Sequence, residues 1–151
     1  MRQTHRRGRR SSDSRLKNDA PSAERCGIDS VEIARIERLL RETPADGLAD
    51  FFSPQELADA GDGPGRAASL AARFAAKEAC LKLFARGAAL GQVEATDFSV
   101  ARDAWGAPQV VCNAAAQYQL DLNRIARIAL SLTHDRTSAS ASTRTECPIG
   151  S

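Results

Sequence analysis

Apolar residues recur at helical spacing through residues 66–86, a stretch that is rich in Ala and Leu and contains neither Pro nor Gly. The pattern predicts a helix that Gly87 closes. One face carries an apolar stripe, which consists of Leu70, Phe74, Leu81 and Phe84. Arg73 and Lys77 fall on or beside this stripe, where a plain amphipathic helix has apolar side chains. The run of residues 73–79 is therefore the strongest pointer to chemistry in the chain.

Glu78 and Lys82 lie four residues apart on the flank of the same helix. A pair at this spacing commonly stabilises a solvated helix surface by about 0.2–0.5 kcal/mol. That interpretation suffices for the two residues taken alone. The neighbouring Lys77, which departs from the amphipathic pattern, weakens it.

Shorter periodic segments surround the long helix. Helices are predicted at residues 30–41, 54–60 and 114–122, and strands at residues 26–29, 97–102, 109–112, 128–132 and 137–143. The second and third strands are predicted to form a hairpin. Ser53 is the predicted N-cap of the helix at residues 54–60. The mixture predicts an α+β fold, in which the long helix packs on a small, mostly antiparallel sheet.

Two polar residues stand at the ends of predicted strands. Asp29 lies at a strand-to-helix junction, where a carboxylate most often caps the following helix. His134 follows an apolar strand, and a single histidine there is more often a hydrogen-bonded structural residue than a ligand. Neither residue defines a site on its own.

The composition fits one domain with one core. The chain has 151 residues, 42% hydrophobic content and 5% aromatics, so we expect a core of Leu, Ile, Val and Ala. The formal net charge of +2 hides an asymmetry, because the first 20 residues hold seven Lys or Arg against two Asp. Residues 1–25 are predicted to form a basic, disordered extension. A solvated extension is its simplest interpretation, ahead of nucleic-acid binding or a transit peptide.

Cysteine spacing and hydropathy limit the cellular compartments in which we expect this protein. The four cysteines show no CxxC spacing, which argues against zinc and against a disulfide framework. Residues 1–25 contain no apolar run, so they predict neither a signal peptide nor a membrane span. We therefore expect a cytoplasmic protein without a membrane partner.

Five segments share one known pattern. They are Gly-Ile-Asp and its continuation at residues 27–36, Phe-Ser-Pro-Gln-Glu-Leu at 52–57, Arg-Phe-Ala-Ala-Lys-Glu-Ala at 73–79 with Lys82, Gly-Ala-Pro at 106–108, and Ser-Leu-Thr-His at 131–134. In order and spacing they resemble holo-acyl-carrier-protein synthase, the small type of 4′-phosphopantetheinyl transferase. The likeness covers residues 26 to about 141, and its specific part is Gly-x-Asp combined with Arg-Phe-x-x-Lys-Glu-Ala.

The resemblance implies a Mg²⁺-dependent transfer of 4′-phosphopantetheine from coenzyme A to a serine of apo acyl-carrier protein, which releases adenosine 3′,5′-bisphosphate. Asp29 and Glu78 match the metal ligands, and Mg²⁺ usually takes one or two protein carboxylates. Lys82 would stabilise or protonate the departing phosphate. Whether Glu78 or a water bound to the ion accepts the serine proton stays open.

The same resemblance assigns contacts to the substrate. Arg73, Lys77 and His134 would contact phosphates of coenzyme A. Gly106 and Pro108 would bound a segment that approaches the adenine through its backbone, which glycine permits.

Subunit and carrier contacts follow from the resemblance as well. Arg35 matches a carrier-protein contact, and Arg38 and Arg41 share its face, although a solvated face is the simpler interpretation. Family members are typically homotrimers whose active sites span each subunit boundary. A homotrimer is therefore expected here.

The chain departs from the pattern at both ends of the domain. Glu24 and Arg25 stand where the family has an apolar stretch, so the first strand is expected to begin late. Polar residues replace an apolar last strand, and we expect a domain at residues 26–143 followed by an irregular tail at 144–151. A frayed last strand would weaken subunit contacts.

A non-catalytic protein is the competing hypothesis. It would be a carrier-protein-binding subunit, or an RNA-binding module that uses its basic arm. It leaves Asp29, Glu78, Lys82 and His134 unexplained, so nucleic acid is not an expected partner. The pattern does not specify whether the carrier serves fatty-acid or polyketide synthesis.

Overall fold

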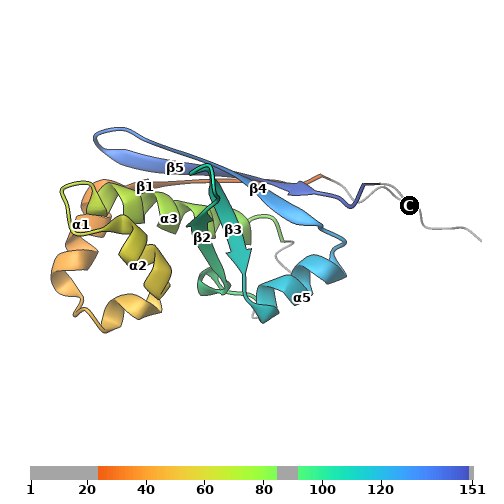
Figure 1. The fold of residues 1–151 in the computed structure, drawn as a ribbon, viewed down its shortest axis with the longest axis horizontal. Coiled ribbons are helices and arrows are strands. Elements are labelled where there is room, and N and C mark those ends of the chain that lie inside the picture. The colour runs from red at the N-terminus through yellow and green to blue at the C-terminus, as the bar shows by residue number, and fades with distance from the viewer. Residues whose placement is uncertain (1–23, 85–91, 150–151) are drawn as a thin grey trace, which may run out of the picture.

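The computed structural model describes residues 24–84 and 92–149 (Figure 1). Its helices and strands are β1 (Cys26–Glu32), α1 (Ile33–Glu42), α2 (Pro54–Ala60), α3 (Arg66–Leu81), β2 (Phe98–Arg102), β3 (Pro108–Cys112), α5 (Ala114–Leu122), β4 (Arg127–His134) and β5 (Ser138–Glu146). Helices and antiparallel strands confirm the predicted α+β class. Residues 1–23 of the expected extension, and Gly87, lie outside the described residues.

β5 is the central strand of an antiparallel sheet with the order β1-β5-β4. β1 pairs with residues 138–144 of β5, and β4 pairs with residues 139–146. The expectation of a frayed last strand is therefore wrong, because every residue of β5 is paired on at least one side. The strand also continues to Glu146 instead of ending at residue 143, so three residues of the expected tail belong to the sheet. β1 begins at Cys26, as predicted.

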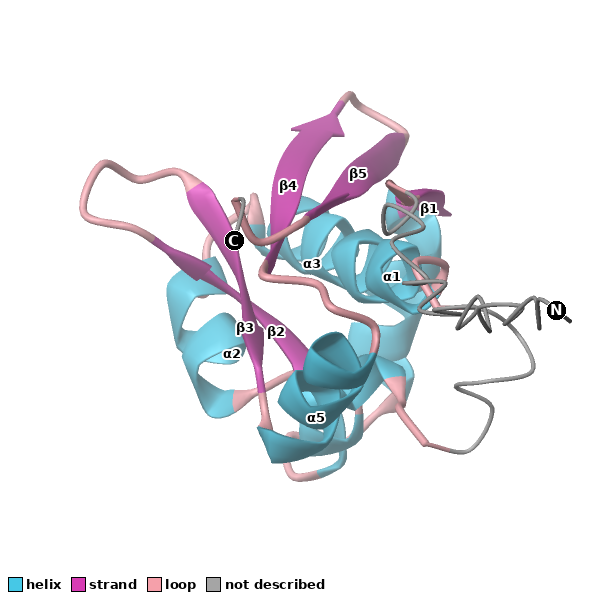
Figure 2. Ribbon diagram, turned by 90° about the vertical axis from the view of Figure 1, so that its right-hand side faces the viewer, coloured by secondary structure: helices cyan, strands magenta, loops and turns pink. Residues whose placement is uncertain are grey.

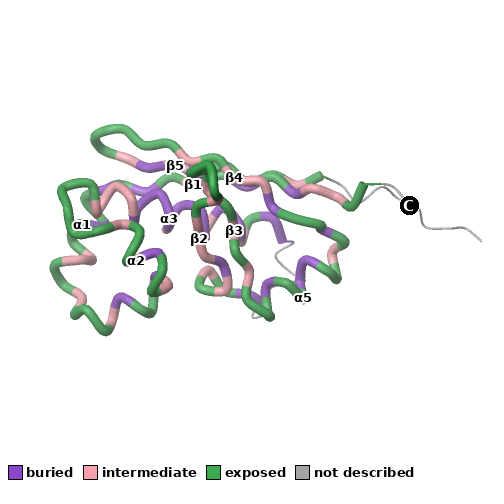
Figure 3. The backbone as a smooth tube through the Cα atoms, viewed as in Figure 1, coloured by how far each residue is buried: buried purple, intermediate pink, exposed green. Residues whose placement is uncertain are grey.

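Small residues let α3 lie close beneath this sheet (Figure 1). A Cβ atom on Gly27 would stand only 2.1 Å from the carbonyl oxygen of Ala79, so no side chain fits there. The Thr143 hydroxyl, from β5, donates a hydrogen bond shared between the carbonyl oxygens of Ala79 at 3.0 Å and Gly27 at 3.3 Å. Buried residues consequently follow α3 along its length (Figure 3).

α3 ends earlier than its periodic pattern predicts. Leu81 is its last residue, instead of residue 86, and Lys82 is the C-cap. The amides of Leu83 and Phe84 then bond to the carbonyls three residues back, at 3.1 and 3.2 Å. Both side chains are buried in a second apolar cluster, and this packing accompanies the tight turn that ends the helix.

The remaining elements agree well with their patterns. β2 and β3 form the predicted hairpin as a separate two-stranded sheet, visible in Figure 2. α2 begins with a capping box in which Ser53 and Glu56 satisfy each other's amides. α5 has the predicted bounds and is capped by Asn113. No helix of the described residues is long and apolar enough to cross a membrane.

Candidate active site

Lys77 lies in the core, where it forms an ion pair with Glu56 of α2. The Lys77 side chain is 3% exposed, and its ammonium lies 2.5 Å from Glu56 Oε2 and donates to the Phe51 carbonyl at 2.7 Å. Glu56, at 0% exposure, also accepts hydrogen bonds from the amides of Ser53 at 2.9 Å and Val100 at 2.8 Å. The expected contact between Lys77 and coenzyme A does not fit this geometry, because its donors are turned inward. Lys77 instead links α3 to α2, and its partner Glu56 extends the link to β2.

Arg73 is equally buried but borders a pocket. Its side chain is 3% exposed, and one guanidinium nitrogen donates to the carbonyl and the hydroxyl of Ser69. Burial lowers the pKa of this guanidinium below its usual range. The pocket has a volume of about 330 Å³. We call it the cationic pocket, and its polar lining comes from Ser69, Arg73, Arg102, Thr133 and His134, beside Pro108.

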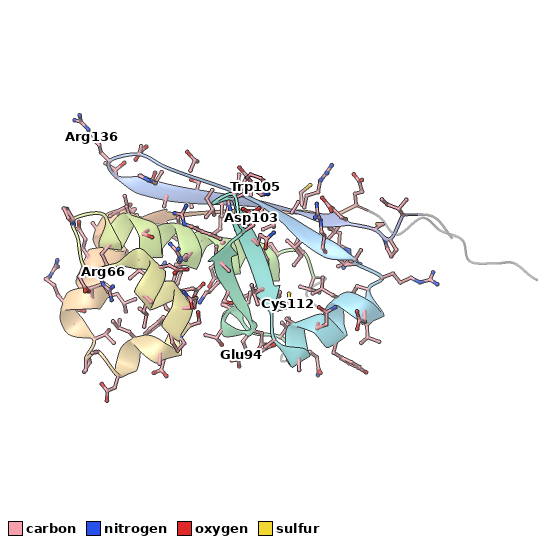
Figure 4. The ribbon with its side chains drawn as sticks, in the orientation of Figure 1. Arg66, Glu94, Asp103, Trp105, Cys112 and Arg136 are labelled. Atoms are coloured by element: carbon pink, nitrogen blue, oxygen red, sulfur yellow. The ribbon has the colours of Figure 1, made fainter. Side chains whose placement is uncertain are left out.

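Three predicted coenzyme A contacts thus meet in the cationic pocket, from α3, β3 and β4. They are Arg73, Pro108 and His134. Gly106 does not line it and belongs instead to the turn of the β2–β3 hairpin, with a φ of 82° that favours glycine. Asp103 and Trp105 mark this turn in Figure 4.

A second group of predicted residues meets where β1 passes the C-terminal end of α3. Asp29 lies inside β1, because that strand continues to Glu32. The expected capping role is therefore wrong, and α1 begins at Ile33 without a side-chain cap. The Lys82 ammonium lies 2.9 Å from Asp29 Oδ1 and donates to the Ile28 carbonyl at 2.6 Å.

Glu78 lies one helical turn before Lys82, whose amide donates to the Glu78 carbonyl, and we call Asp29, Glu78 and Lys82 the carboxylate corner. The Glu78 carboxylate is half-buried and makes no hydrogen bond or ion pair to another described residue. Lys82 has turned to Asp29, so the i,i+4 pair with Glu78 is not formed. Within the described ranges no group of three or more His, Cys, Asp or Glu could hold a metal ion. A set of two carboxylates, one without a partner, nevertheless fits Mg²⁺, which fills its other positions with water and phosphate oxygen.

The carboxylate corner and the cationic pocket lie on different sides of α3. Arg73 and Lys82 are separated by nine positions, which is about 180° of rotation and about 14 Å along a helix axis. One copy of the chain therefore keeps the two groups apart.

Arg35 lies on the exposed side of α1, as predicted. Its guanidinium carbon stands 5.1 Å from the centre of the Phe74 ring, within cation–π range. Arg38 and Arg41 are exposed on the same helix. A groove of about 240 Å³ runs beside them, and its lining includes Phe51 and Phe74.

Two residues of these arrangements were not predicted from the sequence as site residues. Arg102 lines the cationic pocket, and Glu56 is the partner of Lys77. The hairpin register could have indicated Arg102, since Arg102 pairs across the strands with Pro108. No local signal indicated that Glu56 reaches α3.

Comparisons with known proteins agree on one family. The family described as the 4′-phosphopantetheinyl transferase superfamily matches residues 25–138. The holo-[acyl-carrier-protein] synthase of Moorella thermoacetica is 42% identical over 118 residues, which cover 76% of this chain and 88% of that protein. The synthase structure from Neisseria meningitidis superposes with a TM-score of 0.68 at 26% identity, over 81% of this chain and 97% of that chain. The Helicobacter pylori synthase, solved in complex with coenzyme A, gives 0.65 at 27% identity, over 80% and 99%.

Proposed function

This chain belongs to the 4′-phosphopantetheinyl transferase superfamily, and we infer that it acts as a holo-acyl-carrier-protein synthase. It transfers 4′-phosphopantetheine from coenzyme A to a serine of apo acyl-carrier protein and releases adenosine 3′,5′-bisphosphate. The observation that carries this function is the pairing of a carboxylate corner with a cationic pocket on the two sides of α3. Such a pair suits phosphoryl transfer, in which positioning and charge stabilisation supply most of the catalysis.

The cationic pocket binds the adenosine end of coenzyme A. Arg73 and His134 supply cationic or hydrogen-bonding groups for its phosphates, and Pro108 supplies an apolar wall beside them. The neighbouring turn at Gly106 presents exposed backbone to the adenine. Relatives solved in complex with coenzyme A support coenzyme A as the substrate of this chain.

Asp29 and Glu78 of the carboxylate corner would hold Mg²⁺. When bound there, the ion neutralises charge on the coenzyme A pyrophosphate. Lys82, whose ammonium already reaches Asp29, supplies a mobile cation for the departing phosphate. Glu78, which has no partner among the described residues, is available to orient the serine hydroxyl or to accept its proton.

A second copy of the chain completes each active site. The carboxylate corner of one copy and the cationic pocket of the next would meet at their boundary, because a single copy separates them by the width of α3. The homotrimer and the cytoplasmic location remain predictions, supported by the family resemblance.

The carrier protein docks on the exposed face of α1. Arg35, Arg38 and Arg41 offer cations to an acidic carrier helix, and the apolar groove beside Phe74 offers a place for one of its side chains. Because these arginines are exposed, salt should weaken the contact.

Incubation of the protein with apo acyl-carrier protein, coenzyme A and Mg²⁺ tests the function. Mass spectrometry should detect a carrier whose mass has grown by one phosphopantetheine group. A carrier in which alanine replaces the acceptor serine is the control and should gain no mass. No mass gain with several apo carriers at high enzyme concentration would contradict the proposed function.

A further inference from the structure

The cationic pocket is lined by positively charged side chains and by no acidic residue. Two guanidinium groups border it, one buried in α3 and one at the exposed end of β2. They belong to Arg73 and Arg102, and no acidic residue lines the pocket with them. A pocket with two arginines and no lining carboxylate is suited to an anion.

Arg73 is incompletely satisfied by the protein. Its Nε is buried and has no hydrogen-bond partner, while its other bonds go to Ser69 alone. Burial is the largest cause of its lowered pKa, and the charge of Arg102 lowers it further. The carboxylates of Glu56 and Asp59 act in the opposite direction without reversing the shift. Glu56 already pairs with Lys77, so Arg73 keeps a buried Nε donor without a partner on a residue that lines the pocket.

The N-terminal end of α3 adds to this field. Gly65, the N-cap, lines the pocket and supplies no side-chain cap, and the first turn contains no acidic residue. The positive end of a 16-residue helix is therefore left without a carboxylate of its own. Together with the unpartnered Nε of Arg73, it indicates a site for a multiply charged anion.

Arg102 is held in place at the mouth of the pocket. It is the last residue of β2, and its guanidinium donates to the Gly106 carbonyl at 3.2 Å across the hairpin turn. That bond uses one of its five N–H donors, so the others remain for a ligand. Because Arg102 is exposed, binding an anion there costs little additional desolvation.

We propose that Arg102 is a specificity-determining residue, which together with Arg73 selects the phosphomonoester of coenzyme A over the phosphates of its pyrophosphate. The inference rests on the proposed function. The 3′-phosphate carries about two negative charges near pH 7, whereas each pyrophosphate phosphorus of coenzyme A carries about one. Two guanidinium groups with the end of α3 match the dianion. Arg102 thereby distinguishes coenzyme A from 3′-dephospho-coenzyme A.

Calorimetric titration of the full chain with coenzyme A and with 3′-dephospho-coenzyme A, without carrier protein, tests the proposal. Arg102→Gln should weaken coenzyme A binding about tenfold, as expected for a lost charge-assisted contact, and leave the dephospho compound within about twofold. In the transfer reaction, the ratio of KM for 3′-dephospho-coenzyme A to KM for coenzyme A should fall by the same factor.

Arg136→Gln is the matched control, because Arg136 is also an exposed arginine next to a strand end but points away from the body of the molecule (Figure 4). It should change neither affinity. Equal weakening of both ligands by Arg102→Gln, or of neither, overturns the proposal. A wild-type chain that prefers coenzyme A in the titration yet transfers nothing would instead contradict the proposed function and leave the role of Arg102 intact.

Discussion

The two sides of α3 use the same residue types for opposite purposes. On the side of α2, Lys77 and Glu56 are both buried, and the Glu56 carboxylate has three donors from different segments. On the side of β1, Lys82 is 52% exposed and Asp29 is 21% exposed, and Glu78 beside them has no partner in the described part of the chain. Both sides contain a lysine within hydrogen-bond distance of a carboxylate.

The difference lies in what each pair leaves free. A buried pair with its other hydrogen bonds satisfied has no capacity for a ligand, and separating it is costly. An exposed pair contributes little to stability, because water screens it, so a competing cation or phosphate can replace either partner. Burial and hydrogen-bond saturation thus distinguish the structural lysine from the one available for catalysis.

Lys77→Met should show the largest effect, on stability. It leaves the Glu56 charge buried without a counter-ion, and we expect a loss of about 3–5 kcal/mol in the free energy of unfolding. Urea unfolding at 25 °C measures it. Glu56→Gln combined with Lys77→Met removes both charges and should recover more than half of the loss.

KM for coenzyme A separates this structural role from substrate binding. In the folded fraction of Lys77→Met, KM should stay close to the wild-type value, since the ammonium faces Phe51 and Glu56. Wild-type stability combined with a raised KM would instead assign Lys77 to the coenzyme A site.

The sequence predicted the elements better than it predicted the direction of the charged side chains. Periodicity located α5 and the β2–β3 hairpin, since local patterns and turn residues specify them. It misplaced the end of α3, because burial of Leu83 and Phe84 in tertiary contacts decides that boundary. Asp29 was expected to cap a helix because the local pattern ended the first strand there. Pairing with β5 extends β1 to Glu32, and such long-range pairing does not appear in a local pattern.

The site follows the same rule. The motif selected Lys77 and Lys82 together, but only packing against Glu56 or Asp29 shows which lysine is free. Arg102 was not predicted as a site residue, because its position in the pocket depends on the register of the hairpin and on the packing of β4 beside it. Residues in one linear motif can therefore have unrelated roles when they lie on different sides of a helix.

Glu78→Gln and Asp29→Asn test the side of α3 that faces β1, and we expect the second largest effect from them, on the transfer rate. Each should lower the transfer rate about a hundredfold to a thousandfold, because a charge that stabilises the transition state is lost. Stability should change by less than about 1 kcal/mol, as these carboxylates take part in at most an exposed pair.

Asp121→Asn, at an exposed acidic position on α5, provides the matched control and should leave the rate unaltered. Turnover at the wild-type rate in both Asp29→Asn and Glu78→Gln would remove the proposed metal ligands.

Lys82→Met should have the smallest effect, and it concerns the competition between the lysine and a divalent cation. The Lys82 ammonium neutralises Asp29 in the chain alone, so its removal should tighten cation binding, by about twofold to fivefold given the exposure of the pair. Titration with Mn²⁺, followed by electron paramagnetic resonance without coenzyme A, measures this directly. Lys82→Arg keeps the charge and should leave the affinity unchanged. Weaker cation binding in Lys82→Met would mean that the lysine organises the carboxylates for the ion. The Lys82–Asp29 pair would then not be exchangeable, and the contrast with the saturated Lys77–Glu56 pair would fail.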